Sequence, residues 1–149
     1  MSTITNRELQ ETLIASHVAI VFDSLPNEVS YNGAPLPPNI FKTTITVPRS
    51  KDTDPFQFAQ MCIEKCEEQC VYVLVPGKKF DAYGTRHGRG GGWYDRFLSA
   101  VPRSWIRIGI TKTSDFSETS LPHNTWDEKM DWVLVSDGKK KSWQVYKTT

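Results

Sequence analysis

Runs of apolar residues alternate along the chain with segments whose apolar residues recur at helical spacing. Residues 70–76, CVYVLVP, are continuously apolar, as is typical of a strand covered on both faces of a sheet. Residues 43–49, TTITVPR, alternate and are rich in β-branched side chains, which also predicts a strand. The other predicted strands are residues 17–24, 105–111 and 132–136, with residues 143–147 as a last edge strand.

Two helices are predicted between these strands. Asp54 is a suitable N-cap, and Pro55 follows it at the first helical position, where proline is tolerated. Apolar residues then recur at helical spacing at Phe58, Met61, Cys62 and Cys66. Residues 93–101, WYDRFLSAV, predict a second and shorter helix. Residues 25–39 contain four prolines and an Asn-Gly pair, which predict a loop.

Strands that alternate with helices favour an α/β layer structure. The 149 residues are enough for one domain with its own core and too few for two, so residues 1–149 are expected to form a single domain.

The formal net charge of +1 gives no overall field that would favour nucleic acid or an anionic membrane as a partner. No apolar run approaches the roughly 20 residues that span a bilayer. The first residues lack a basic start followed by an apolar run, so no secretory signal is expected.

Three cysteines, Cys62, Cys66 and Cys70, follow one another at steps of four. This spacing differs from the CxxC motif of zinc sites. Free thiols in a reducing compartment are the favoured interpretation, which predicts a cytoplasmic protein. A metal or redox cluster is the alternative, and it is disfavoured because Cys70 is predicted to begin the next strand.

A glycine-rich segment before the second predicted helix carries the clearest signal of chemistry. Four glycines lie within residues 88–92, and Arg86 and Arg89 flank them. Glycine lets backbone N–H groups approach a ligand, and the first turn of a helix adds unpaired N–H donors, so the segment suits a phosphate. A flexible surface loop explains this composition equally well, because no Walker A or Rossmann-type glycine motif is present. Asp95, just inside the helix, is either a metal ligand or a carboxylate that compensates the helix dipole.

Residues 75–98, VPGKKFDAYGTRHGRGGGWYDRFL, are similar to the signature motif of the 5-formyltetrahydrofolate cyclo-ligase family. The segments IGIT and LPHNTWDEKMDWVLV also resemble that family's terminal pattern, in which Leu-Pro and two aspartates precede a final strand. The resemblance covers roughly the C-terminal half of the chain. It implies a three-layer α/β sandwich with a mostly parallel central sheet. It also implies a ligase that uses ATP and Mg²⁺ to convert 5-formyltetrahydrofolate to 5,10-methenyltetrahydrofolate.

The resemblance further implies a set of site residues. The nucleotide would be bound by Arg86, His87, Gly88, Arg89, Gly90, Gly91, Gly92, Trp93 and Tyr94. The folate would be bordered by Arg89, Gly90, Gly91, Gly92 and Trp93, Mg²⁺ would be held by Asp95 and Asp127, and Arg89 and Tyr94 would be catalytic. Phosphorylation of the formyl oxygen would turn it into a good leaving group before N10 attacks. A transfer of this kind depends on positioning and on neutralisation of charge.

Some features depart from the family pattern. Lys78 and Lys79 occupy positions that are usually apolar, and Trp93 stands where tyrosine is commoner, an exchange that still allows stacking on a pterin. The family usually opens with a basic N-terminal helix and an acidic substrate-binding helix, whereas Arg7 is the only basic residue before the first predicted strand. A short form lacking the usual N-terminal region, with weak or absent turnover, is therefore expected. The alternatives are a nucleotide- or folate-binding homologue without turnover, a protein completed by a partner chain or a second copy, and an enzyme of the same fold acting on another anionic substrate.

Overall fold

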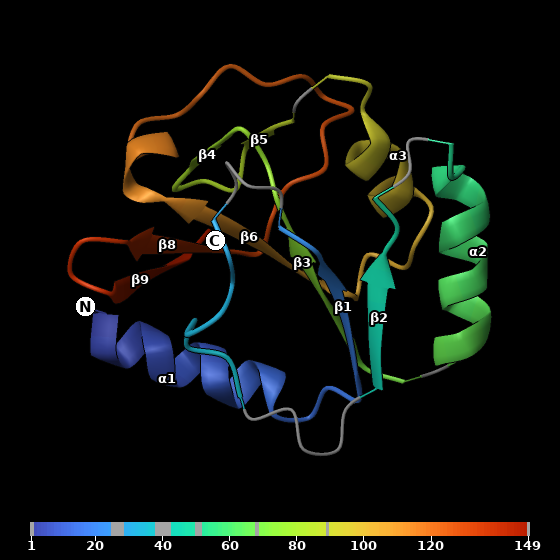
Figure 1. Cartoon of the computed structure of the whole chain (residues 1–149), viewed down its shortest axis with the longest axis horizontal. Coiled ribbons are helices and arrows are strands. Elements are labelled where there is room, and N and C mark those ends of the chain that lie inside the picture. Colours follow the sequence, from blue (N-terminus) through green and yellow to red (C-terminus); the bar gives the residue numbers. More distant parts are fainter. Residues whose placement is uncertain are drawn as a thin grey trace.

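A six-stranded sheet forms the centre of the described structure (Figure 1). The computed structural model describes residues 2–24, 29–37, 43–49, 52–67, 69–88 and 90–148. The strands of this sheet are β1 (Val18–Phe22), β2 (Thr43–Val47), β3 (Val71–Val75), β6 (Ile106–Lys112), β8 (Trp132–Asp137) and β9 (Ser142–Lys147). Their order is β2-β1-β3-β6-β8-β9, and every neighbouring pair is parallel except β8 with β9. The prediction of a mostly parallel central sheet is confirmed.

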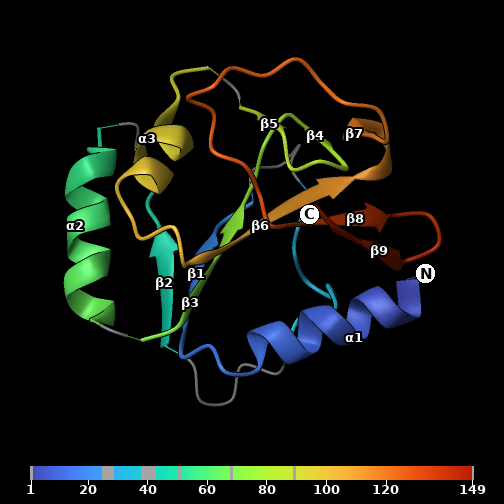
Figure 2. The same ribbon diagram turned by 180° about the vertical axis from the view of Figure 1, so that it is seen from behind.

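Helices cover both faces of the sheet. α1 (Ser2–Leu13) lies on one face, and α2 (Pro55–Cys66) and α3 (Trp93–Ser99) lie on the other (Figures 1 and 2). Two apolar clusters fill the spaces between the layers, one containing Leu9 of α1 and the other containing Phe58 of α2 and Phe97 of α3. This arrangement confirms the predicted three-layer α/β architecture. No helix among the described residues is both long enough and apolar enough to cross a membrane.

The structure confirms the predicted start of α2 and the predicted burial of β3 on both faces of the sheet. Asp54 Oδ1 accepts a hydrogen bond from Phe56 N at 2.9 Å, and Pro55 occupies the first helical turn. All five residues of β3 are buried, and alternate side chains enter opposite apolar clusters. Residues 29–37 contain neither helix nor strand, as predicted for this loop. Residues 25–28 and 38–39 of the same prediction lie outside the described residues.

Several short or polar elements are not predicted by the sequence pattern. α1 buries Leu9 and Leu13 completely, but residues 6–13 are otherwise polar, and two leucines give too weak a periodicity to predict a helix. A second sheet has the order β5-β4-β7, formed by β4 (Lys79–Asp81), β5 (Arg86–His87) and β7 (Phe116–Ser117), and η1 (Thr113–Asp115) precedes β7. β4 and β5 lie between residue 76 and the glycines, where the sequence pattern predicts no strand. Strands of two or three residues are too short to show an alternating pattern.

The cysteines occupy two different environments. Cys62 and Cys66 are buried on α2, whereas Cys70 is exposed just before β3. Burial, together with a smaller effect of the neighbouring Cys66, raises the pKa of the Cys62 thiol to about 12. Burial also raises the pKa of Cys66, so both thiols are protonated near neutral pH and pack as small apolar side chains.

Gly109 of β6 lies against the ring of Phe80, which is completely buried. A Cβ at position 109 would overlap that ring, so Gly109→Ala is expected to lower the free energy of unfolding by about 1–3 kcal/mol. Gly138→Ala is the matched control, because a Cβ there would meet no described atom within 4 Å and should change stability by less than about 0.5 kcal/mol. Urea unfolding measures both variants against the parent protein. Equal unfolding midpoints for the two variants would contradict this packing.

Candidate functional site

A cleft of about 930 Å³ opens at the carboxyl-terminal ends of β1, β2 and β3. Its other walls come from residues within the glycine segment, the first turn of α3 and the segment that follows β7. The chain leaves β1 to form β2 on one side of it, and then crosses back to form β3 on the other side. In a parallel sheet such a reversal leaves a crevice beyond the strand ends, where ligands usually bind. The position and volume of the cleft are therefore those of a small-molecule site.

Three consecutive glycines in this cleft have left-handed backbone conformations. The φ angles of Gly90, Gly91 and Gly92 are +97°, +73° and +66°, which other residues rarely adopt in succession. A Cβ at Gly90 or Gly91 would meet no described atom within 4 Å, so conformation rather than crowding requires glycine there. Gly92 O accepts the hydrogen bond of Arg96 N at 3.1 Å as α3 begins. The segment presents backbone without side chains, which suits a phosphate. Arg89, which precedes it, lies outside the described residues.

Arg86 is fixed beside these glycines. Its Nε donates a hydrogen bond to Pro76 O at 2.6 Å, and its guanidinium carbon lies 5.1 Å from the centre of the Tyr94 ring. A Cβ at Gly88 would lie 3.1 Å from Arg86 Nη1, so the glycine makes room for the guanidinium group. The side chain of Arg86 is buried and still lines the cleft. A positive charge of fixed position therefore lies at the predicted phosphate site.

His87 and the buried Asp81 fasten the segment after β7 to the small sheet. His87 Nε2 lies 2.6 Å from Pro122 O, so this nitrogen carries a proton and donates it to the carbonyl oxygen. Asp81 Oδ2 accepts a hydrogen bond from Leu121 N at 2.8 Å, while its Oδ1 accepts two from backbone N–H groups of the turn between β4 and β5. Figure 2 shows this segment passing over the small sheet toward α3. His87, predicted as a nucleotide ligand, thus also supports the facing wall of the cleft.

Asp95 and Asp127 reach the cleft from different elements. Asp95 lies in the first turn of α3, and its Oδ1 accepts a long hydrogen bond of 3.5 Å from Glu128 N, the residue after Asp127. Asp127 Oδ2 accepts a hydrogen bond from Asn124 N at 2.8 Å, which closes a turn. Both aspartates line the cleft. Two carboxylates that are 32 positions apart in the sequence therefore face the same space beside the glycines.

The donor set can be compared with what Mg²⁺ requires. Mg²⁺ usually takes one or two carboxylates and completes its coordination with phosphate oxygens and water. In the part of the chain that the structure describes, no group of three or more His, Cys, Asp or Glu side chains is arranged to hold a metal ion. Two carboxylates next to a segment suited to phosphate therefore fit Mg²⁺ that binds together with a nucleotide, rather than an ion held by protein ligands alone.

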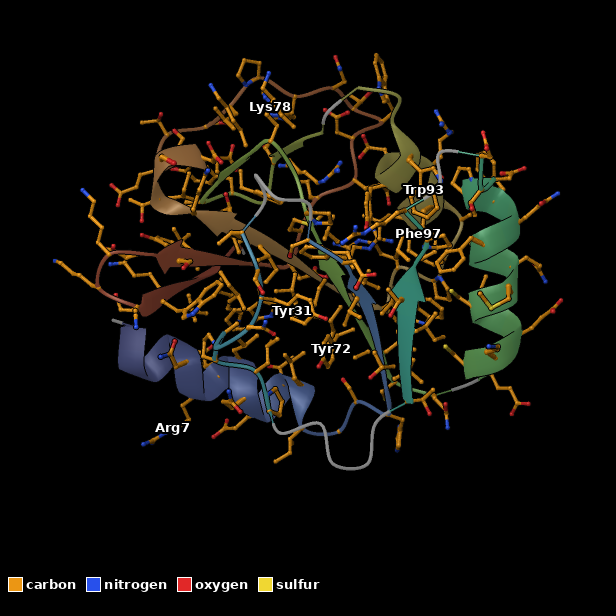
Figure 3. The ribbon with its side chains drawn as sticks, viewed as in Figure 1. Arg7, Tyr31, Tyr72, Lys78, Trp93 and Phe97 are labelled. Carbon is orange, nitrogen blue, oxygen red and sulfur yellow. The ribbon has the colours of Figure 1, made fainter. Side chains whose placement is uncertain are left out.

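Trp93 and Tyr94 form an aromatic wall of the cleft. Trp93 Nε1 donates a hydrogen bond to Thr53 O at 2.8 Å, and its ring stacks on Phe97 with the centroids 5.4 Å apart. These two side chains lie together between α3 and α2 (Figure 3). Tyr94 packs edge-on against Trp93, with centroids 5.2 Å apart, and lies under the guanidinium group of Arg86. The indole is thus anchored in the core while it borders the cleft.

Two charged residues at strand ends line the cleft although the sequence pattern did not identify them. Arg49 follows β2 and Asp23 follows β1, with 3.9 Å between Arg49 Nε and Asp23 Oδ2. Arg49 Nη2 also donates a hydrogen bond to Ser24 O at 3.1 Å. The side chains of Arg49 and Asp23 are 58% and 63% exposed, so this wall is open to solvent. Both lie at the carboxyl ends of predicted strands, residues 17–24 and 43–49, and that position is the signal that identifies such residues.

Known proteins match the region that builds most of this cleft. A family model described as the 5-formyltetrahydrofolate cyclo-ligase family matches residues 51–136. A probable 5-formyltetrahydrofolate cyclo-ligase of Schizosaccharomyces pombe is 29% identical over an alignment of 82 residues, which covers 48% of this chain and 40% of that protein. A 5-formyltetrahydrofolate cyclo-ligase of Mycoplasma genitalium is 30% identical over 63 residues, 42% of this chain and 37% of that protein. The matched region thus spans less than half the length of either curated relative.

Two solved structures have a similar fold. The 5,10-methenyltetrahydrofolate synthetase of Mycoplasma pneumoniae superposes with a TM-score of 0.55 at 18% identity, covering 91% of this chain and 83% of that one. The 5,10-methenyltetrahydrofolate synthetase of Aquifex aeolicus gives a TM-score of 0.57 at 19% identity, covering 99% of this chain and 82% of that one. At these identities the likeness concerns the arrangement of helices and strands.

Proposed function

Because the chain belongs to the 5-formyltetrahydrofolate cyclo-ligase family, we propose that it converts 5-formyltetrahydrofolate to 5,10-methenyltetrahydrofolate with ATP and Mg²⁺. The observation that supports this most is the composition of one cleft. Its wall combines three glycines of positive φ, a buried arginine and two aspartates from separate elements. These groups match the needs of a nucleotide whose phosphate is transferred. The free thiols Cys62 and Cys66 suit a reducing compartment, and we propose the cytoplasm.

The proposed reaction has two stages. The formyl oxygen attacks the γ-phosphate of ATP, so that ADP leaves and the formyl carbon becomes bonded to a phosphate ester oxygen. N10 of the folate then attacks that carbon and gives up its proton to the phosphate or to water, and the carbon–oxygen bond breaks to release inorganic phosphate and leave the ring closed. Neither stage needs a nucleophile from the protein, so the side chains serve to position the reactants and to neutralise charge.

Different residues of the cleft would position the reactants and neutralise their charge. The backbone of Gly90, Gly91 and Gly92 would hold the phosphates, and Arg86 would face them with a charge that is already fixed in place. Arg89 would add a second guanidinium group at the transferred phosphate. Asp95 and Asp127 would hold Mg²⁺, which neutralises phosphate charge when bound.

Trp93 and Tyr94, the aromatic wall of the cleft, also have proposed roles in the reaction. The guanidinium group of Arg86 lies over the Tyr94 ring. Tyr94, proposed as catalytic from the family resemblance, would therefore contribute by positioning Arg86 at the reacting phosphate. Trp93 would border the folate with the part of its indole that lines the cleft.

A homologue that binds nucleotide or folate without turnover is the second candidate. The open wall at Arg49 and Asp23 favours it, because both side chains are more than half exposed. Phosphoryl transfer benefits when water is excluded from the reacting groups. A second copy of the chain or a partner protein that covered this wall would then be needed for turnover.

Calorimetric titration with ATP, in Mg²⁺ and then in EDTA, tests the site before any turnover is measured. We expect ATP to bind and the affinity to be higher in Mg²⁺. Equal affinity in both conditions would contradict the assignment of Asp95 and Asp127, and no heat of binding in either would contradict the nucleotide site itself.

A further inference from the structure

Arg107 is a buried charged residue in the middle of the sheet. It lies on β6, where its neighbours Ile106 and Ile108 face the cluster under α1. The alternation of the strand therefore directs Arg107 to the opposite face, under α3. Only 1% of its surface is exposed. A buried charge requires hydrogen-bonding or oppositely charged partners, and these partners show which segments of the chain Arg107 holds together.

The hydrogen-bond partners of Arg107 connect it to Asp95 by two routes, one through Leu98 of α3 and one through Glu128. Arg107 Nη1 pairs with Glu128 Oε1 at 2.6 Å, and Arg107 Nη2 donates a hydrogen bond to Leu98 O at 2.9 Å. Leu98 lies one turn after Asp95 on α3. Glu128 N in turn donates the 3.5 Å hydrogen bond to Asp95 Oδ1. The guanidinium group thus ties the helix that carries Asp95 to the segment that carries Asp127, the residue before Glu128.

We infer that Arg107 is a positioning residue, which sets the separation of the Asp95 and Asp127 carboxylates and thereby the affinity of the site for Mg²⁺ with nucleotide. The inference rests on the proposed function, because it assumes that these two aspartates hold the metal. The contact between Glu128 N and Asp95 is long and would not fix the two segments by itself. The charged contact of Glu128 with Arg107 is short, and the two side chains are 24% and 2% exposed, so it holds Glu128 beside α3. Hydrogen bonds between Asp131 and the backbone of Arg107 hold the end of the same segment on β6.

A role in stability alone is the competing explanation, and it makes a different prediction. Replacing a buried ion pair by apolar side chains of similar size is often neutral or stabilising. Arg107 Nε is also buried without a hydrogen-bond partner among the described residues, which is unfavourable for folding. The pair is therefore weak evidence of a stabilising role. Removing Arg107 alone leaves Glu128 and Leu98 O without their partner, so a residue kept only for stability would lower the unfolding temperature when replaced and leave the Mg²⁺ dependence of the folded protein unchanged.

The test is Arg107→Met, with the Mg²⁺ dependence of ATP binding as the readout. We expect the Mg²⁺ concentration that gives half of the full effect on ATP affinity to rise at least about tenfold, as for other residues that orient metal ligands. Because the variant removes only one partner of the ion pair, the unfolding temperature is also expected to fall, and binding is therefore measured well below it. Arg103→Met is the matched control, because Arg103 binds Asp131 at the surface and does not line the cleft. Its Mg²⁺ midpoint should not change.

A second variant keeps the test decisive if Arg107→Met does not fold. Glu128→Gln keeps an oxygen that accepts a hydrogen bond from Arg107 and removes the charge, at a side chain that is 24% exposed. It should shift the Mg²⁺ midpoint in the same direction by a smaller factor. Unchanged midpoints in the folded variants would overturn the role of Arg107. ATP binding that is independent of Mg²⁺ in the parent protein would instead overturn the metal assignment, and the role of Arg107 with it.

Discussion

Replacing Asp127 with asparagine is expected to lower ATP-dependent formation of methenyltetrahydrofolate by at least about 100-fold. Asparagine has the size of aspartate, and its carbonyl oxygen can still accept the hydrogen bond of Asn124 N that closes the local turn. The substitution therefore removes the charge and leaves the backbone in place. Without that charge one of two proposed Mg²⁺ ligands is lost, and with it the neutralisation of phosphate charge that is worth several kcal/mol in the transition state.

The comparison for Asp127→Asn is made with two other variants. Asp95→Asn should cause a loss of similar size, since both carboxylates line the same cleft. Asp115→Asn should leave the rate unchanged, because Asp115 pairs with Lys112 at 3.8 Å and does not line the cleft. The initial rate is measured at saturating ATP over a range of Mg²⁺ concentrations. Full activity in Asp127→Asn and Asp95→Asn would remove both residues from the metal site.

Arg89→Ala is expected to weaken ATP binding by about 1–3 kcal/mol, the range for the loss of a charge-assisted hydrogen bond, or roughly 5- to 150-fold in affinity. Arg89 lies outside the described residues, between Gly88 and Gly90, which both line the cleft. Arg86 gives a less selective test. It is buried and holds the carbonyl of Pro76, so its removal would disturb the end of β3 as well as the nucleotide.

Calorimetry with ATP measures the effect of Arg89→Ala, and thermal unfolding checks that the fold is unaffected. Arg103→Ala is a suitable control, because it removes an arginine of the same chain that does not line the cleft. ATP affinity equal to that of the parent protein would exclude Arg89 from the nucleotide site.

The layered fold follows from local patterns in the sequence. The continuous apolar run that becomes β3 predicts a strand covered on both faces, and Asp54 with Pro55 predicts the start of α2. α1 is different, since only Leu9 and Leu13 mark its buried side. Such a helix is stabilised by packing on the finished sheet more than by its own pattern, so the sequence alone does not predict it.

The candidate site also has a part that the local sequence predicts and a part that depends on the folded structure. The glycine segment with Asp95 is continuous in sequence, so its composition indicates an anion site directly. Asp127 comes from a family pattern, and its place beside Asp95 depends on contacts across the fold.

The roles of Asp81 and Arg107 have no local signal of function. Asp81 is followed three positions later by Gly84, which indicates a turn, but its hydrogen bond with Leu121 joins residues 40 positions apart. Arg107 occupies an apolar strand, and its partners become visible only when β6 is packed under α3. Long-range pairing of this kind is not encoded in spacing.

The most direct test of the proposed function is the near-ultraviolet absorbance of purified protein mixed with ATP, Mg²⁺ and 5-formyltetrahydrofolate. A product band of methenyltetrahydrofolate should grow with time only when all three are present, slowly in keeping with the weak turnover expected from the sequence, and its rate should increase with protein concentration. Binding of ATP and of 5-formyltetrahydrofolate without any product band would contradict the proposed turnover and leave the chain as a ligand-binding member of its family.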